Sequence, residues 1–276
     1  MKNINNKVEC VGILVIYYND FINRSILEFE SLINNISRKN MIFIISNFSE
    51  YQKTTSKSKF LNWNNQNQEF GAWQYGLEQA LDKLNYNSKP CFIFANDTFC
   101  YHKTYGGFEK YMYSKFFKKI VDLDQKIIVG PTSSSKLGQL SFEGSVFTRW
   151  VSTSLFGISY KLMETFKFNI CIDQKYLNKY FDGQTEKDFF SKKLDNSMKN
   201  HLIAWLFGRS NLPMWRNGTS LNNENYLIMK NKASSILREK NITANAILSN
   251  AVILDVFKNL KIRKIFFYLL RLFKYK

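Results

Sequence analysis

The chain has 276 residues, of which 45% are hydrophobic, and its 25 Phe and 15 Tyr exclude a disordered protein. The formal net charge of +17 indicates an anionic partner, which is a nucleic acid, a membrane surface or a phosphorylated substrate. Two histidines and four cysteines without a CxxC pair are too few and too scattered for a zinc cluster, so we expect a reduced, cytosolic protein. The first residues lack a signal peptide's apolar stretch, and no segment reaches the roughly 18 consecutive apolar residues of a membrane span.

The first 130 residues alternate short apolar runs with segments of helical spacing. The run at 11–18 is rich in β-branched residues and is typical of a strand buried on both faces. Similar apolar runs predict further strands at 41–46, 91–95 and 126–129, and a weaker strand at 60–61. Apolar residues at helical spacing predict helices at 24–36, 70–84 and 108–121. This alternation predicts an α/β fold with a mostly parallel sheet flanked by helices.

The second half of the chain is less regular. It predicts a strand at 151–159, a short helix at 160–168, a strong helix from Leu194 to near Gly208, and a helix at 231–239. No internal repeat and no clean boundary appear before residue 250, so we expect one domain over residues 1–250.

Polar side chains gather where the predicted strands end. In an open parallel sheet, ligands bind beyond the carboxyl ends of the strands. Those ends are Asn19-Asp20, Asn47, Asn96-Asp97 and Gly130-Pro131. A carboxylate at the tip of a rigid strand, such as Asp97, suits Mg²⁺, which is held by one or two carboxylates together with substrate phosphates. The alternative is an Asx turn that caps the strand.

Glu69 and Gly71 stand at the start of the helix at 70–84. Glycine admits a close backbone approach there, and Glu69 can cap the helix or bind a ligand. The alternative for both residues is an ordinary helix start. The sequence has no GxGxxG after the first strand, no Walker A motif and no GxSxG, so a dinucleotide site is not expected.

Residues 65–98 resemble the rhamnan synthesis protein F family of bacterial polysaccharide glycosyltransferases, which resemble the family 2, GT-A type enzymes. That family has Asn-x-Gly-x-Asp-x-Gly-Ala-aromatic, a helix ending in Gly-Leu, and an apolar strand closing on Asn-Asp-Ser. The matching residues here are Asn65, Gly71-Ala72-Trp73, Gly76-Leu77 and Asn96-Asp97-Thr98. Asn67 replaces the first glycine and Glu69 the Asp, and weaker similarity at 145–166 and 194–208 extends the resemblance to roughly residues 10–210.

The resemblance implies a GT-A-like, Rossmann-like domain that moves a sugar from a nucleotide-diphosphate donor to a lipid-linked or oligosaccharide acceptor. Asp97 would hold Mg²⁺ or Mn²⁺ against the donor diphosphate. The residues expected to bind the donor are Asn19, Asn47, Asn65, Glu69, Gly71, Asn96 and Asp97. An inverting transfer also needs a carboxylate base, for which Asp195 is the candidate; the alternative is an ordinary first-turn residue of its helix.

Residues 251–276 carry seven Lys and Arg against one Asp, interleaved with bulky apolar residues. This pattern predicts an amphipathic C-terminal helix on an anionic membrane surface, and we expect a cytoplasmic protein that is peripheral on the inner face of the bacterial cell membrane. The alternative is a helix docked on the catalytic domain. Two other function classes stay open: a non-catalytic membrane-associated scaffold, and a nucleic-acid-binding protein, which is less expected because no nucleic-acid motif accompanies the charge.

Overall fold

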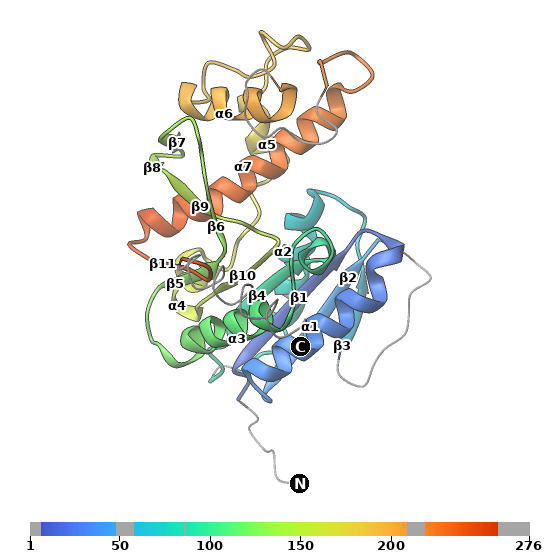
Figure 1. The fold of residues 1–276 in the computed structure, drawn as a ribbon, viewed down its shortest axis with the longest axis vertical. Helices are drawn as coiled ribbons and strands as arrows, with labels where there is room; N and C mark the ends of the chain where they lie inside the picture. Colours follow the sequence, from blue (N-terminus) through green and yellow to red (C-terminus); the bar gives the residue numbers. More distant parts are fainter. Residues whose placement is uncertain (1–6, 48–57, 86, 209–218, 259–276) are drawn as a thin grey trace, which may run out of the picture.

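A seven-stranded sheet forms the centre of the molecule (Figure 1). The computed structural model describes residues 7–47, 58–85, 87–208 and 219–258. The strand order is β11-β5-β10-β4-β1-β2-β3; β10 is antiparallel to both of its neighbours, and the other pairs are parallel. The strands are β1 (Cys10–Ile16), β2 (Asn40–Ser46), β3 (Ser58–Asn62), β4 (Cys91–Asn96), β5 (Ile127–Gly130), β10 (Leu155–Ile158) and β11 (Val252–Asp255). The predicted α/β class with a mostly parallel sheet is confirmed.

Helices cover both faces of this sheet, which is why its central strands are apolar on both sides. Alternate residues of β1 enter two separate cores, with Leu14 on one face and Ile13 on the other. Gly12 is required on the first face because a Cβ there would lie 2.8 Å from Ile33 of α1. The flanking helices are α1 (Ile22–Ile36) and α3 (Gly107–Asp122) on the first face, and α2 (Gln68–Leu81), α4 (Tyr160–Thr165) and α7 (Tyr226–Leu248) on the second.

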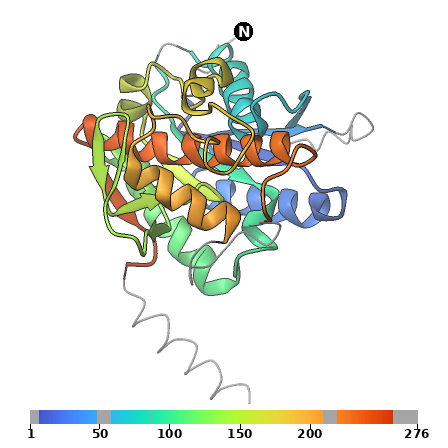
Figure 2. The same ribbon diagram turned by 90° about the horizontal axis from the view of Figure 1, so that it is seen from above.

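A third apolar core includes residues of helices α6 (Asn196–Phe207) and α7. Helix α6 lies beside the sheet and next to α7 (Figures 1 and 2). Helix α7 contributes Ile242 to the sheet's second core and Leu237 to this third core, so it joins the two parts. Helix α6 ends at Phe207 and is followed by Gly208, whose φ of 67° is the left-handed conformation that favours glycine. The other elements are β6 (Thr132–Ser134), β7 (Leu140–Phe142), β8 (Ser145–Phe147), β9 (Arg149–Val151), α5 (Gln174–Leu177), α6 (Asn196–Phe207), and the 3₁₀ helices η1 (Asn19–Phe21), η2 (Asp97–Cys100) and η3 (Asn178–Tyr180).

Three predicted elements differ from the structure. The strand predicted at 151–159 is divided between β9 and β10, and the helix predicted at 231–239 is the middle of the much longer α7. The C-terminal helix predicted from residue 251 does not begin there, because Val252–Asp255 pairs in parallel with β5 and completes the sheet. Residues 259–276, which hold most of that predicted helix, lie outside the described residues. Within the described ranges, no helix combines the length and the apolar character that crossing a bilayer requires.

Candidate functional site

The strand order reverses between β1 and β4. From β1 the chain adds β2 and β3 on one side, and β4 then enters on the other side. In open α/β sheets, ligands bind at such a switch point, outside the carboxyl ends of the strands. The candidate site is therefore the crevice beyond the ends of β1 and β4, where Tyr17 and Asp97 lie.

Asp97 extends the contact between these two strands beyond the end of their backbone ladder. Its side chain is fully buried, and Oδ2 accepts hydrogen bonds from the backbone N–H groups of Tyr17 (2.7 Å) and Tyr18 (2.8 Å). Burial raises the pKa of the carboxyl, and these two hydrogen bonds oppose that shift. One oxygen of Asp97 thus has a structural function, and only Oδ1 is available for a ligand.

Four buried side-chain atoms at this edge have no hydrogen-bond partner among the described residues. They are Tyr17 Oη, Gln68 Oε1, Asp97 Oδ1 and Arg238 Nη1. Burial raises the pKa of the Tyr17 hydroxyl, and the nearby charges of Glu69 and Asp97 raise it further. Native proteins pair nearly all buried polar atoms, so several unpaired ones together call for an explanation. We call Tyr17, Gln68, Glu69, Asp97 and Arg238 the switch-point cluster.

The loop before α2 has a demanding backbone. Asn65, Asn67 and Gln68 have φ values of 63°, 59° and 56°, in the left-handed region that Asn tolerates better than most residues. Gly71 makes this loop possible, because a Cβ there would lie 2.0 Å from the carbonyl oxygen of Gln66. The close approach expected at Gly71 is thus made by the loop's own backbone. Strain of this kind is concentrated at functional sites in proteins.

Helix α7 closes the cluster from the other side. Arg238 is almost fully buried; its Nη2 donates to Asn67 Oδ1 at 2.7 Å, and its Nε donates to the carbonyl of Ile172 at 2.9 Å. One turn earlier, Ser235 Oγ donates to Glu69 Oε1 at 3.0 Å. Because Asn67 uses its side chain in this way, no side chain caps the start of α2. The N–H of Gln68, the first residue of α2, donates to the carbonyl oxygen of Asn65 at 3.0 Å, so it is the positive end of the helix dipole that favours an anion here.

The other predicted site residues lie on the same edge, with one exception. Asn96 ends β4, and its Oδ1 accepts a hydrogen bond from Thr98 Oγ1 at 2.6 Å. Asn19 and Asn47 are exposed after β1 and β2, and no contact described in the structure joins them to the switch-point cluster. The exposed Asn65 accepts the backbone N–H of Gln68 with its carbonyl oxygen.

The exception is Asp195, which is exposed and caps α6. Its Oδ1 accepts hydrogen bonds from the Ser197 backbone N–H at 2.8 Å and from the Ser197 hydroxyl, which together lower the pKa of the carboxyl. Helix α6 belongs to the third core and not to the sheet (Figure 1). No described contact connects Asp195 with the switch-point cluster.

Two adjoining cavities extend along the edge from β4 toward β11. One of about 400 Å³ lies over the ends of β5 and β11, and the other, of about 390 Å³, lies between the sheet and helices α6 and α7. Lys103 and Ser133 line both cavities. We call the second cavity the edge cleft; its lining includes Lys103, Ser133, Trp150, His201, Trp205, Glu239 and Lys240.

Sequence reasoning did not find the residues that α7 brings to the edge. Arg238, Glu239 and Lys240 are three consecutive charged residues, a pattern typical of an exposed helix face, yet Arg238 and Lys240 are 1% and 2% exposed. The sequence signal for this burial was the weak amphipathic pattern of residues 226–248. A helix that carries polar residues on every side and still packs in a protein must bury some of them.

The chain matches no known family model, and no curated protein has a similar sequence. The resemblance to the rhamnan synthesis protein F family thus rests on the motif in residues 65–98 and its weaker extensions.

Proposed function

We propose that the protein is a glycosyltransferase that takes its sugar from a nucleotide-diphosphate donor bound at the switch-point cluster. The proposal depends on one observation: four buried polar atoms without a described partner lie beyond the carboxyl ends of β1 and β4, at the switch point. Tyr17 Oη and Arg238 Nη1 are donors, whereas Gln68 Oε1 and Asp97 Oδ1 are acceptors. A ligand that offers hydroxyl groups together with phosphates can pair with both kinds of atom.

The loop before α2 supports the same proposal. In the resembling family, a glycine stands where this chain has Asn67, and Asn67 adopts the left-handed conformation that suits glycine and asparagine. The mostly parallel sheet is compatible with a GT-A-like domain. A divalent cation would find Asp97 Oδ1 as its protein ligand, with the donor phosphates supplying further oxygens, and would offset the charge of the departing diphosphate. The acceptor proposed from the resemblance is a lipid-linked glycan or an oligosaccharide.

Tyr17→Phe tests the proposal without disturbing the fold. Because the Tyr17 hydroxyl has no hydrogen-bond partner in the part of the chain that the structure describes, its removal should leave the free energy of unfolding unchanged or slightly higher. Affinity for the donor should fall by about 5- to 10-fold, which corresponds to one lost hydrogen bond of about 1 kcal/mol. Calorimetric titration with UDP-glucose, UDP-N-acetylglucosamine, GDP-mannose and dTDP-rhamnose, in the presence of Mn²⁺, measures this change.

Tyr160→Phe is the matched control, since Tyr160 begins α4 after β10 has returned to the opposite edge of the sheet. Donor binding with unchanged affinity in Tyr17→Phe would separate the cluster from the donor site. If no nucleotide sugar binds the wild-type protein, the proposed function is wrong. Binding without any release of nucleoside diphosphate would instead indicate the non-catalytic scaffold.

A further inference from the structure

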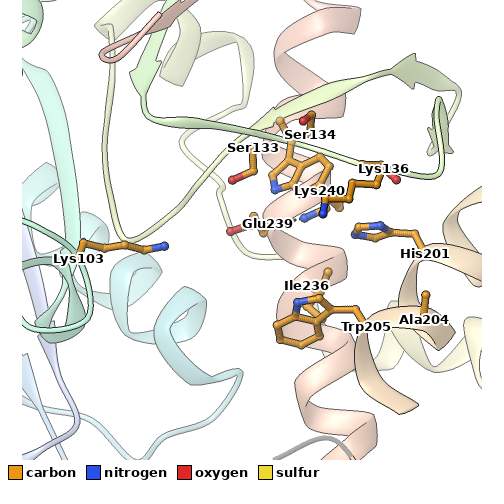
Figure 3. Close-up of a pocket in the computed structure, with 12 residues that line it drawn as sticks. Lys103, Ser133, Ser134, Lys136, His201, Ala204, Trp205, Ile236, Glu239 and Lys240 are labelled. Atoms are coloured by element: carbon orange, nitrogen blue, oxygen red, sulfur yellow. Dashed lines mark hydrogen bonds and ion pairs between the residues drawn. The ribbon is translucent and has the colours of Figure 1, made fainter. Parts of the chain in front are cut away.

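The edge cleft contains a carboxylate that the switch-point cluster does not use. Glu239 reaches the cleft from α7, and its side chain is 21% exposed. Figure 3 shows Lys103 on one side of the cleft and His201, Trp205 and Ile236 on the other, with Glu239 and Lys240 between them. The cleft thus combines an ionisable acid with aromatic and cationic walls.

Glu239 is held in one position by three hydrogen bonds. Its Oε1 accepts a hydrogen bond from Lys240 Nζ at 2.6 Å, and its Oε2 accepts from Thr153 Oγ1 at 3.1 Å and from the Thr153 backbone N–H at 3.3 Å. Burial opposes ionisation, but the Lys240 ammonium and the hydrogen bonds from Thr153 outweigh it and lower the pKa of the Glu239 carboxyl. Glu239 is therefore an oriented carboxylate at neutral pH. The neighbouring His201 is neutral there, because burial lowers its pKa to about 4.

Two short connections link the elements that carry this carboxylate to those of the switch-point cluster. Along the sheet, Thr153 precedes Ser154, whose carbonyl accepts the backbone N–H of Asn96 at 3.1 Å, at the end of β4. Along α7, Glu239 follows Arg238, which belongs to the switch-point cluster. Transfer between a ligand in the cleft and a ligand at the cluster would take place across residues 96–97 and 238–239.

We infer that the edge cleft binds the hydroxyl-bearing acceptor and that Glu239 is the general base of the transfer. This inference rests on the proposed function. The acceptor oxygen attacks the anomeric carbon of the donor sugar and forms the new O–C bond, while its proton passes to the Glu239 carboxylate. The bond between the anomeric carbon and the phosphate oxygen breaks, and its electron pair leaves with the nucleoside diphosphate. Such a direct displacement inverts the anomeric configuration, and the protonated Glu239 then releases its proton to solvent.

Glu239→Gln tests the inference because it keeps the shape of the side chain and removes the base. Release of nucleoside diphosphate should fall by about 100-fold or more, the usual contribution of a general base, with water and with octyl β-glucoside as acceptor probes. Calorimetric affinity for the nucleotide sugars should stay at the wild-type value, since the base acts on the acceptor. Glu164→Gln is the matched control, because Glu164 is an exposed carboxylate on α4, away from the cleft.

A double variant separates chemistry from folding. Glu239→Gln leaves Lys240 buried without its partner, which is destabilising. Combining it with Lys240→Met removes that buried charge and keeps an apolar side chain against Trp150, over whose ring the ammonium lies at 3.7 Å. We expect the double variant to recover the wild-type melting temperature and to remain deficient in turnover. Recovery of both would overturn the role of Glu239 as a base and leave the proposed function intact, whereas a wild-type protein that binds no nucleotide sugar would overturn both.

Discussion

Replacing Asp97 tests whether its two carboxylate oxygens have separate roles, with Oδ2 accepting backbone hydrogen bonds and Oδ1 facing the donor. Asp97→Ala removes the acceptor of two buried backbone N–H groups, those of Tyr17 and Tyr18. An unsatisfied buried donor costs about 1–3 kcal/mol, so the free energy of unfolding should fall by about 2–5 kcal/mol. β1 and β4 would remain paired through their backbones from Cys10↔Cys91 to Val15↔Asn96 and would lose only this side-chain contact.

Asp97→Asn should behave differently. Its amide oxygen can replace Oδ2 and accept both N–H groups, while its NH₂ group takes the place of Oδ1, which has no partner within the described ranges. Since burial already raises the pKa of Asp97 and so disfavours the charged form, loss of the charge should change the free energy of unfolding by less than about 1 kcal/mol. Turnover should nevertheless be almost abolished, because the Asn variant lacks the oxygen proposed to face the cation and the diphosphate.

Urea unfolding followed by tryptophan fluorescence measures both stabilities, and nucleoside diphosphate release measures turnover. Equal destabilisation in the Ala and Asn variants would refute the assignment of Oδ2 to the two backbone N–H groups. An Asn variant with wild-type turnover in the presence of Mn²⁺ would refute the assignment of Oδ1 to the donor.

Two further predictions concern the third core. His201 has a pKa of about 4 when folded and about 6.5 when unfolded, so the stability that its neutral form provides is complete above pH 6.5 and is lost as the pH falls toward 4. Relative to His201→Asn, the wild-type protein should lose about 2 kcal/mol of unfolding free energy between pH 7.5 and pH 5, and an equal pH dependence in both proteins would contradict this. Asp195→Ala should lower the free energy of unfolding by about 1 kcal/mol as a lost N-cap, whereas Asp195→Asn should be nearly neutral. A large fall in turnover in the Asn variant would show that Asp195 is the base predicted from the sequence.

The sheet was predictable because its interior strands are buried on both faces. β1, β2 and β4 appear as short, continuous apolar runs rich in β-branched or aromatic residues, which are typical of strands buried on both faces. The strands β6 to β9 have only three residues each, too few for a periodic pattern. β11 was assigned to a helix because its four residues run into a basic segment, and its pairing with β5 depends on a partner more than 120 residues away.

The site was predictable only where its residues adjoin a strand or a helix with a clear sequence pattern. Asp97 and Glu69 stand next to elements with clear patterns, so the carboxyl edge could be located from the sequence. Arg238 meets Asn67 across 171 residues of chain, and nothing local indicates that contact. Tyr17 was missed because a tyrosine at the end of an apolar strand looks like a core residue, and only the structure shows that its hydroxyl is buried without a partner.

The basic C-terminal segment can be tested cleanly only if the truncation spares β11. A chain ending at residue 250 lacks β11 and the Asp255 carboxylate, which accepts from Thr132 Oγ1 at 2.6 Å and pairs with Arg149 at 2.7 Å, so we expect it to be markedly less stable. A chain ending at residue 258 retains the contacts that the described residues make with one another and should keep the wild-type melting temperature and donor affinity.

The chain ending at residue 258 also lacks six of the seven basic residues of 251–276, each of which contributes about 1 kcal/mol near an anionic bilayer. We therefore expect the full-length protein to sediment with vesicles containing phosphatidylglycerol and to release them as salt rises, because screening weakens attraction between exposed charges. The chain ending at residue 258 should not sediment with them. If it binds these vesicles as well as the full chain does, residues 259–276 are not the membrane contact. If it unfolds while the full-length protein ignores the vesicles, those residues stabilise the domain instead.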